Sequence, residues 1–182
     1  MRTIISELPS RRNFVRGRYS VEIGYPWLTH GAIMALEKIV SPDFNVLEFG
    51  AGGSTIFFSR HCYTVKTFES DLRWMEKVKK ALLEPSNVKI MLSDISQSLT
   101  AIAGEKESYY DVILVDNDPS PDWSHRRFIL DAVPPLLKKG GYLVIDNYDK
   151  ERLRTFDYSN WDVYTFDFFN YTGRGTRICI KQ

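Results

Sequence analysis

The sequence predicts an α/β fold with a doubly wound, mostly parallel seven-stranded sheet and a C-terminal antiparallel hairpin. Three observations predict this fold class: strand-like apolar runs alternate with helical runs, a glycine-rich turn closes the first strand, and the last two strand-like runs share a short connection. Alternating strands and helices imply crossovers that keep the strands parallel and cover both faces of the sheet. A short connection instead favours a hairpin.

The first elements lead into the glycine turn. Apolar residues at helical spacing predict a helix over 26–40, and Pro26 suits its first turn. The run Asn45–Phe49 predicts a buried strand that ends abruptly in glycines, followed by a short helix from 55 to about 60. This order of strand, tight turn and helix is typical of the first unit of a parallel sheet.

The alternation continues to the end of the chain. In order, we expect a strand at 63–68, a helix at 72–83, a strand at Val88–Leu92, a weaker helix at Ile95–Ala103, a strand at 111–115, a helix at 124–137, and strands at 142–145, 161–169 and 176–180. The last two strands are joined by 170–175, which contains two glycines. The final strand is therefore expected to be antiparallel to the parallel sheet.

Length and composition favour one domain. A chain of 182 residues with 43% hydrophobic content can bury one sizeable core. We expect a polar N-terminal arm at 1–18 and a single domain at 19–182. The arm carries four arginines that could grip phosphate, although a solvated tail is the ordinary interpretation; they are Arg11, Arg12, Arg16 and Arg18.

The net charge and the cysteines indicate which partners and which cellular compartment to expect. The net charge is +1, so no global field favours nucleic acid or membrane. Cys62 and Cys179 lack the spacing of a zinc site or a disulfide framework. The chain shows neither a signal peptide nor a run of about 18 apolar residues. A cytoplasmic protein without a membrane partner is expected, and a homodimer is left open.

The turn after the first strand has the composition of a cofactor loop. Gly50, Gly52 and Gly53 let the backbone approach a ligand closely, and Ser54 follows them near a helix start. Glu48 places a carboxylate at the strand end, where it could order the loop and accept hydrogen bonds from a cationic ligand. Glycine alone is weak evidence, because many α/β turns need glycine only for a tight bend.

The run Val46-Leu-Glu-Phe-Gly-Ala-Gly-Gly-Ser-Thr55 resembles the first motif of class I, Rossmann-like S-adenosylmethionine-dependent methyltransferases: an aliphatic strand, an acid, then GxG. The resemblance covers about 26–182 and implies S-adenosylmethionine as cofactor. A dinucleotide-binding fingerprint would place its third glycine at Thr55 and would not require the acid Glu48. Both differences count against a nicotinamide cofactor.

Two further acids follow the next strands. Glu69 ends the second strand, where a carboxylate can accept hydrogen bonds from both ribose hydroxyls, and it matches the family's ribose-binding acid. Asp94 ends the third strand and matches the family's adenine-binding acid, with Ile95 as an apolar wall. Asp94 could instead simply cap the following helix, and Asp71 is the better candidate for the cap of its own helix.

The ends of the fourth and fifth strands supply a candidate catalytic edge. Asp116, Asp146 and Asn147 should meet there, and their oxygens suit Mg²⁺. The set resembles the metal site of catechol-type O-methyltransferases, in which the metal binds two substrate oxygens. The stretch Val115-Asp-Asn-Asp-Pro119, followed by residues 136–147, also resembles bacterial small-molecule methyltransferases whose fourth strand ends in Asp-Gly-Asp-His. Pro119 replaces the lysine of the first group and the histidine of the second.

The proton acceptor is consequently open. Asp116, which we also count among the cofactor-binding candidates, His125 or a metal-bound substrate oxygen could each serve. A lone histidine near a helix start is more often structural than catalytic. Methyl transfer needs mainly alignment of nucleophile and methyl group and exclusion of water, so little acid–base machinery is obligatory.

The sequence predicts a methyltransferase that acts on an O or N nucleophile of an unidentified small molecule. Nucleic acid is an unlikely acceptor because no broad basic or aromatic platform is evident. Two alternatives stay open at this point. Pro119 favours a protein that binds the adenosyl cofactor without catalysis, and a nicotinamide-dependent oxidoreductase is disfavoured by Glu48 and Thr55.

Overall fold

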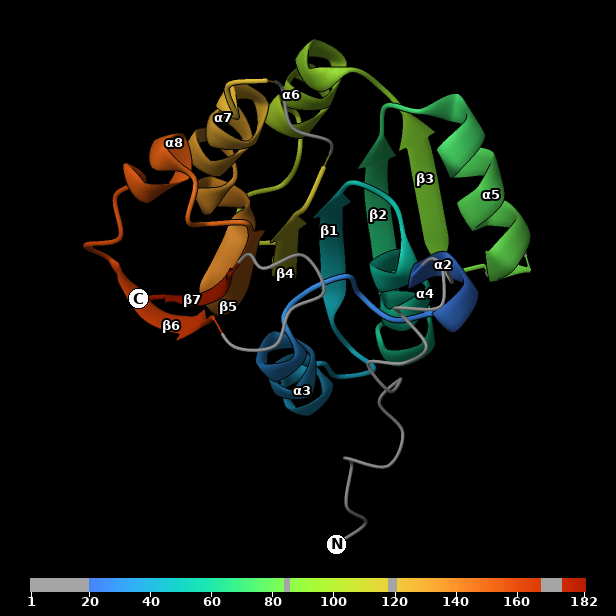
Figure 1. The fold of residues 1–182 in the computed structure, drawn as a ribbon, viewed down its shortest axis with the longest axis horizontal. Helices are drawn as coiled ribbons and strands as arrows, with labels where there is room; N and C mark the ends of the chain where they lie inside the picture. The colour runs from blue at the N-terminus through green and yellow to red at the C-terminus, as the bar shows by residue number, and fades with distance from the viewer. Residues whose placement is uncertain (1–19, 84–85, 118–120, 168–174) are drawn as a thin grey trace, which may run out of the picture.

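A mixed sheet forms the centre of the molecule (Figure 1). The computed structural model describes residues 20–83, 86–117, 121–167 and 175–182. Within them, seven strands lie in the order β3-β2-β1-β4-β5-β7-β6. The strands are β1 Asn45–Phe49, β2 Thr64–Glu69, β3 Val88–Leu92, β4 Tyr110–Val115, β5 Leu137–Asp146, β6 Trp161–Phe166 and β7 Thr176–Lys181.

The pairing of the strands confirms the predicted fold class. β1 to β5 pair in parallel. β7 pairs antiparallel with β5 on one side and with β6 on the other. The strand order reverses between β1 and β4, because β1 leads outward to β2 and β3, whereas β4 leads outward to β5. Open α/β sheets bind ligands at such a reversal, beyond the carboxyl ends of the strands.

Helices cover both faces of the sheet (Figure 1). Alternate side chains of each strand point to opposite faces, so Val46 packs with α3 and α4, whereas Leu47 and Phe49 pack with α6, α7 and α8. The helices are α2 Ser20–Ile23, α3 His30–Ile39, α4 Gly53–His61, α5 Leu72–Leu82, α6 Ile95–Ala103, α7 Ser124–Ala132, the 3-10 helix η2 Pro134–Leu136, and α8 Glu151–Arg154.

Several boundaries differ from the sequence prediction. The helix expected over 26–40 begins at His30, after the N-cap Thr29. The helix expected over 124–137 ends at Ala132, because proline has no amide hydrogen and cannot continue an α-helix, so a 3-10 turn follows at Pro134. The strand expected at 142–145 begins at Leu137, and its register shifts across an irregular stretch that contains Gly140 at φ +74°.

β7 ties the end of the chain into the sheet. Its first residue, Thr176, is fully buried; its Oγ1 donates to Asp146 Oδ1 at 3.1 Å and accepts from the Thr29 amide at 3.1 Å. β6 ends at Phe166, and the expected hairpin connection lies largely outside the described residues, as do the N-terminal arm at 1–18 and Pro119. Among the described helices, none is long and apolar enough to cross a membrane.

Candidate active site

The loop between β1 and α4 lies against the end of β4. Gly50 has a φ of +93°, and a Cβ there would lie 2.4 Å from the Asp116 carbonyl oxygen. Only glycine therefore allows this approach. Gly53 serves packing, since its Cβ would lie 2.0 Å from the Tyr25 carbonyl oxygen. Gly52 is buried as well, but a Cβ there would make only ordinary contacts, the nearest with Ser20 Oγ at 3.8 Å. Of the three glycines, Gly52 is the one at which a side chain would meet no close contact.

Glu48 lies fully buried beneath this loop. Its Oε2 accepts hydrogen bonds from Thr55 Oγ1 at 2.6 Å and Thr67 Oγ1 at 2.8 Å, and Thr55 Oγ1 in turn accepts from the Gly52 amide at 2.9 Å. Burial raises the pKa of Glu48 to about 7, although nearby hydroxyls, that of Ser54 included, favour its ionised form. Among described residues, Glu48 Oε1 has no hydrogen-bond partner. The carboxyl group orders the loop, as the sequence predicts.

Glu69 joins the same loop to the end of β2. Its Oε2 accepts from the Ala51 amide at 2.9 Å, and its Oε1 accepts from the amides of Ser70 and Asp71 at 2.7 and 2.9 Å. A carboxylate offers about four acceptor sites, so roughly one remains for a ligand. The ribose contact stays a prediction. Asp71 caps α5 through the Trp74 amide, as expected.

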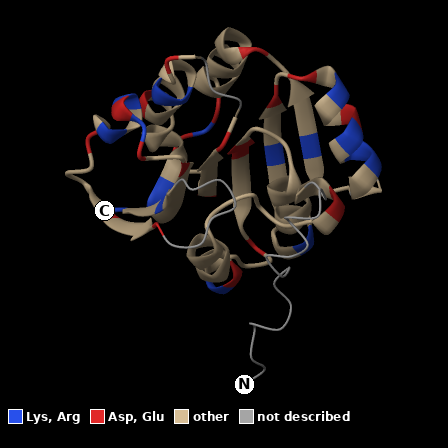
Figure 2. Cartoon of the chain, in the orientation of Figure 1, with Lys and Arg blue, Asp and Glu red and all other residues tan. Residues whose placement is uncertain are grey.

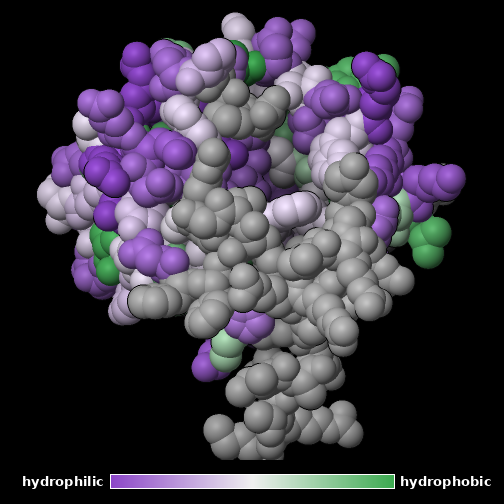
Figure 3. Space-filling model, in the orientation of Figure 1, coloured by the Kyte–Doolittle hydropathy of each residue, from purple (hydrophilic) through white to green (hydrophobic). Residues whose placement is uncertain are grey.

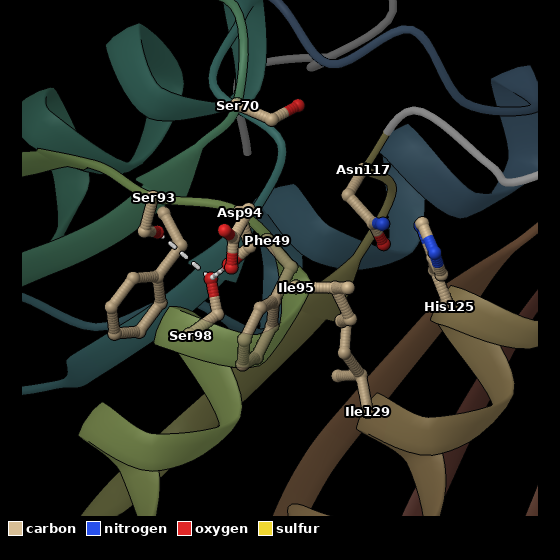
Figure 4. A pocket seen from close by; sticks show the side chains of 10 residues that line it. Phe49, Ser70, Ser93, Asp94, Ile95, Ser98, Asn117, His125 and Ile129 are labelled. Atoms are coloured by element: carbon tan, nitrogen blue, oxygen red, sulfur yellow. Dashed lines mark hydrogen bonds between the residues drawn. The ribbon is translucent and has the colours of Figure 1, made fainter.

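A cavity of about 240 Å³ lies beyond the carboxyl ends of β1 to β4 (Figure 4). Its walls include Phe49, Ser70, Asp94, Asn117 and His125, each from a different segment of the chain. Pockets for whole ligands usually measure at least roughly 300 Å³. The cavity therefore suits one part of a cofactor, such as an adenosyl group.

Asp94 caps α6 and also lies in the wall of the cavity. Its Oδ1 accepts from the Gln97 amide at 2.8 Å, and Gln97 Oε1 accepts from the Asp94 amide at 3.0 Å, so the two residues form a capping box for α6. The same side chain is exposed in the wall of the cavity next to Ile95, as Figure 4 shows. Capping therefore does not remove Asp94 from the cofactor site, although its adenine contact stays a prediction.

The predicted metal ligands lie beside the cavity, around a buried arginine. Arg126 Nη2 donates to Asp116 Oδ1 at 3.1 Å, and Nη1 donates to the Asp146 carbonyl oxygen at 2.9 Å and to Asn147 Oδ1 at 3.4 Å. Nε donates to the Asn117 carbonyl oxygen at 2.8 Å. The Arg126 side chain is only 4% exposed. The guanidinium group thus contacts all three residues that the sequence assigns to Mg²⁺.

The two carboxyl groups of this cluster have raised pKa values. Burial, and to a lesser extent the neighbouring Asp116 carboxylate, raise the pKa of Asp146 to about 8, although Arg126 opposes the rise. Burial also raises the pKa of Asp116, again against the effect of Arg126. Within the described ranges, no three His, Cys, Asp or Glu side chains are grouped to hold a metal ion. The Mg²⁺ predicted at Asp116, Asp146 and Asn147 stays a prediction, and Arg126 already contacts all three residues.

Sequence reasoning missed Arg126, although a pattern marked it. Arg126 lies three and four residues before Ile129 and Leu130, and this spacing places all three on one helix face. Both apolar residues are buried in the core, so a charged side chain on the same helix face must pair with polar groups inside the protein. Of the two predicted catalytic groups, His125 lies in the cavity wall, whereas Asp116 lies in the arginine cluster.

The family model described as "Methyltransferase domain" matches residues 47–148, more than half of the chain. The match begins in β1, covers the glycine loop, the cavity and the arginine cluster, and ends just after β5. A search of curated proteins finds no match.

Solved structures with this fold are numerous and distant in sequence. A putative O-methyltransferase from Klebsiella pneumoniae is 16% identical, with a TM-score of 0.69 over 98% of this chain and 94% of its own. The O-methyltransferase TomG from Streptomyces achromogenes, in complex with SAM, is 13% identical, with a TM-score of 0.69 over 100% of both chains. An rRNA methylase from Streptococcus thermophilus is 19% identical, with a TM-score of 0.62 over 84% and 95%.

Proposed function

The chain belongs to the methyltransferase-domain family and is an S-adenosylmethionine-dependent methyltransferase, and on that premise we propose that its acceptor is an O or N nucleophile of a small molecule. Family membership favours this activity over a nicotinamide-dependent oxidoreductase. Two questions follow: which residues hold the cofactor, and which group receives the proton.

The cavity at the reversal of strand order carries the proposal. It collects Phe49, Ser70, Asp94 and Asn117 from the ends of four adjacent strands, where this class of sheet binds ligands. Asp94 and Ile95 would hold the adenine, Glu69 the ribose, and the loop at Gly52 the remaining part of the cofactor. The absence of close contacts at a Cβ of Gly52 and the remaining acceptor capacity of Glu69 are compatible with these roles.

When bound, S-adenosylmethionine supplies a methyl group on a positively charged sulfur, which a nucleophile can displace directly. The protein must align the nucleophile, exclude water and accept a proton where the nucleophile carries one. We assign the proton to His125, because it lines the cavity and imidazole accepts protons near neutral pH. Asp116 stays an alternative whose carboxylate is already bound to Arg126.

The surface supports a small acceptor. Figure 2 shows that lysines and arginines are mixed with acids over most elements, with the densest basic stretch on α5. On the face drawn in Figure 3, hydrophilic residues predominate in the described part, and hydrophobic ones are scattered. Neither pattern resembles the broad basic and aromatic platform of a nucleic-acid binder.

Calorimetric titration with S-adenosylmethionine, S-adenosylhomocysteine and NAD tests the cofactor site. We expect both adenosyl ligands to bind and NAD not to bind. Asp94→Ser keeps an N-cap of similar quality but removes the carboxylate from the cavity, so affinity should fall by about tenfold, the value of one good hydrogen bond. Asp71→Ser exchanges the same residue types at the cap of α5 and should leave affinity unchanged. Equal losses in the two variants would contradict the adenine assignment.

The acceptor class needs a separate measurement. The protein would be incubated with S-adenosylmethionine carrying a labelled methyl group and with panels of phenols, amines, hydroxy acids and purified RNA. Label should appear on a small molecule. Label on RNA alone would refute the small-molecule proposal while leaving the methyltransferase activity intact.

A further inference from the structure

Arg126 is a buried cation whose position in the fold is unusual. It lies on the inward face of α7, where the neighbouring residues of the stripe are apolar core residues, and its side chain is 4% exposed. A buried guanidinium group is costly unless its donors are satisfied and its charge is balanced. The ring of Trp123 adds an aromatic neighbour, with the guanidinium carbon 5.2 Å from the ring centroid.

The donors of Arg126 point at the ends of two adjacent strands. On the β4 side they reach Asp116 Oδ1 and the Asn117 carbonyl oxygen, and on the β5 side they reach the Asp146 carbonyl oxygen and Asn147 Oδ1. A planar group with five N–H donors can contact all four acceptors, whereas an ammonium group has only three donors. Arg126 therefore fastens the end of β4 to the end of β5.

The same oxygens have the chemistry of a site for a hard divalent cation. Carboxylate, amide and carbonyl oxygens are the ligands that Mg²⁺ prefers. Here the Asp116 carboxylate is paired with the guanidinium group, which lies within hydrogen-bond distance of each of the four oxygens named above. A divalent ion would have to displace Arg126 before it could contact Asp116 Oδ1 or Asn147 Oδ1, whereas Arg126 contacts Asp146 at its carbonyl oxygen and the Asp146 carboxylate accepts from Thr176 Oγ1.

We propose that Arg126 replaces a divalent metal ion in this protein: it joins the ends of β4 and β5, it closes the cluster of Asp116, Asp146 and Asn147 to Mg²⁺, and it makes methyl transfer independent of metal. One consequence rests on the proposed function. An acceptor that need not chelate a metal does not need two adjacent oxygens, so a single hydroxyl or amine is sufficient. In this role Arg126 is a positioning residue.

Metal binding tests the proposal without any acceptor. Mn²⁺ gives an electron paramagnetic resonance spectrum that loses intensity when the ion binds protein. Wild-type protein should leave the spectrum of free Mn²⁺ unchanged. Neither Mg²⁺ nor a chelator should shift the melting temperature of the wild-type protein. Arg126→Ala should bind Mn²⁺ and melt at a higher temperature when Mg²⁺ is added, because a ligand that binds only the folded state stabilises it. Asp146→Asn in that background should abolish both effects.

Arg127 provides a matched control. It is the next residue on α7 and pairs with Asp131 on the surface. Arg127→Ala removes the same charge but should create no Mn²⁺ site and should shift the melting temperature less than Arg126→Ala. If Arg126→Ala folds and binds no Mn²⁺, Arg126 does not stand in the place of a metal. If Arg126→Ala does not fold, Arg126→Lys tests whether Arg126 joins the ends of β4 and β5, because lysine keeps the positive charge but lacks the planar guanidinium group. Arg126→Lys should melt at a lower temperature than wild type and should still exclude Mn²⁺.

Metal binding by a protein that retains Arg126 would overturn the proposal. Binding of Mn²⁺ that Mg²⁺ displaces and that Asp146→Asn removes would show that the cluster holds a metal despite Arg126. Once an acceptor is known, turnover should be unchanged after treatment with a chelator. Failure to find any methyl transfer would count against the proposed function and would leave the metal-binding result unaffected.

Discussion

Gly50 offers the sharpest test of how the cofactor loop is built. The substitution Gly50→Ala adds a single methyl group at a backbone φ of +93°. That methyl carbon would lie 2.4 Å from the Asp116 carbonyl oxygen and 2.7 Å from the Asn117 Cα, and both atoms belong to the main chain. Neither neighbour can rotate away as a flexible side chain could. The loop after β1 and the end of β4 would have to separate.

Two costs combine in this variant. A left-handed backbone conformation costs a residue with a Cβ roughly 1–2 kcal/mol, and forcing an extra carbon into a packed site costs about 1–3 kcal/mol. We expect a loss of about 3 kcal/mol in the free energy of unfolding. For a chain of this size, that loss lowers the melting temperature by roughly 6–12 °C.

Two other glycines separate the contributions in thermal melts. Gly140 also has a positive φ, +74°, but a Cβ there would meet nothing within 4 Å. Gly140→Ala should therefore show the backbone cost alone, roughly 2–8 °C. Gly52→Ala lies in the same loop as Gly50 without the close approach and should cost less than about 1 kcal/mol. If Gly50→Ala melts no lower than Gly140→Ala, the close approach of the loop after β1 to the end of β4 is not the reason that position 50 requires glycine.

The remaining predictions concern protons. Folding raises the pKa of Glu48 from 4.5 to about 7, so its contribution to stability is complete below pH 4.5 and is lost as the pH rises through about 7. Glu48→Gln mimics the protonated form, so its free energy of unfolding relative to wild type should rise by on the order of 3 kcal/mol between pH 4.5 and about 7, as measured by urea unfolding. If the free energies of unfolding of the two proteins change with pH in parallel, this prediction is wrong. His125→Gln should lower kcat about 100-fold while calorimetric affinity for S-adenosylmethionine is unchanged, and an unaltered kcat would exclude His125 as the proton acceptor.

Local sequence patterns were sufficient where one strand and its turn determine the structure. The strand Asn45–Phe49 and the loop with Gly50 and Gly52 lie where the pattern predicts, because an apolar run and glycines act over neighbouring residues. The end of α7 was misplaced because the apolar spacing continues past the point where Pro134 stops an α-helix. Periodicity and proline conflicted there, and proline determined the outcome.

Contacts between distant segments were beyond such patterns. Residue types predicted correctly that Asp116, Asp146 and Asn147 would gather at one edge of the sheet. They did not reveal that Arg126, from a helix between the two strands, enters the same cluster. A sequence gives the side chains that a site contains, whereas the partner of a buried charge depends on how a helix is rotated against the sheet. Asp94 shows the same limit, since its cap is local but its place in the cavity is not.

The position of β7 has a consequence for synthesis. β6 contacts the sheet through β7, which follows it in the chain, so a nascent protein cannot dock β6 until the residues from Thr176 onward have left the ribosome. Thr176 also supplies the hydroxyl bound by Asp146 and by the start of α3. Until then one flank of β5 is an uncovered edge, open to pairing with other chains. A ribosome that stalls before this point would hold a chain with the cofactor loop already made and the neighbouring carboxyl cluster unfinished.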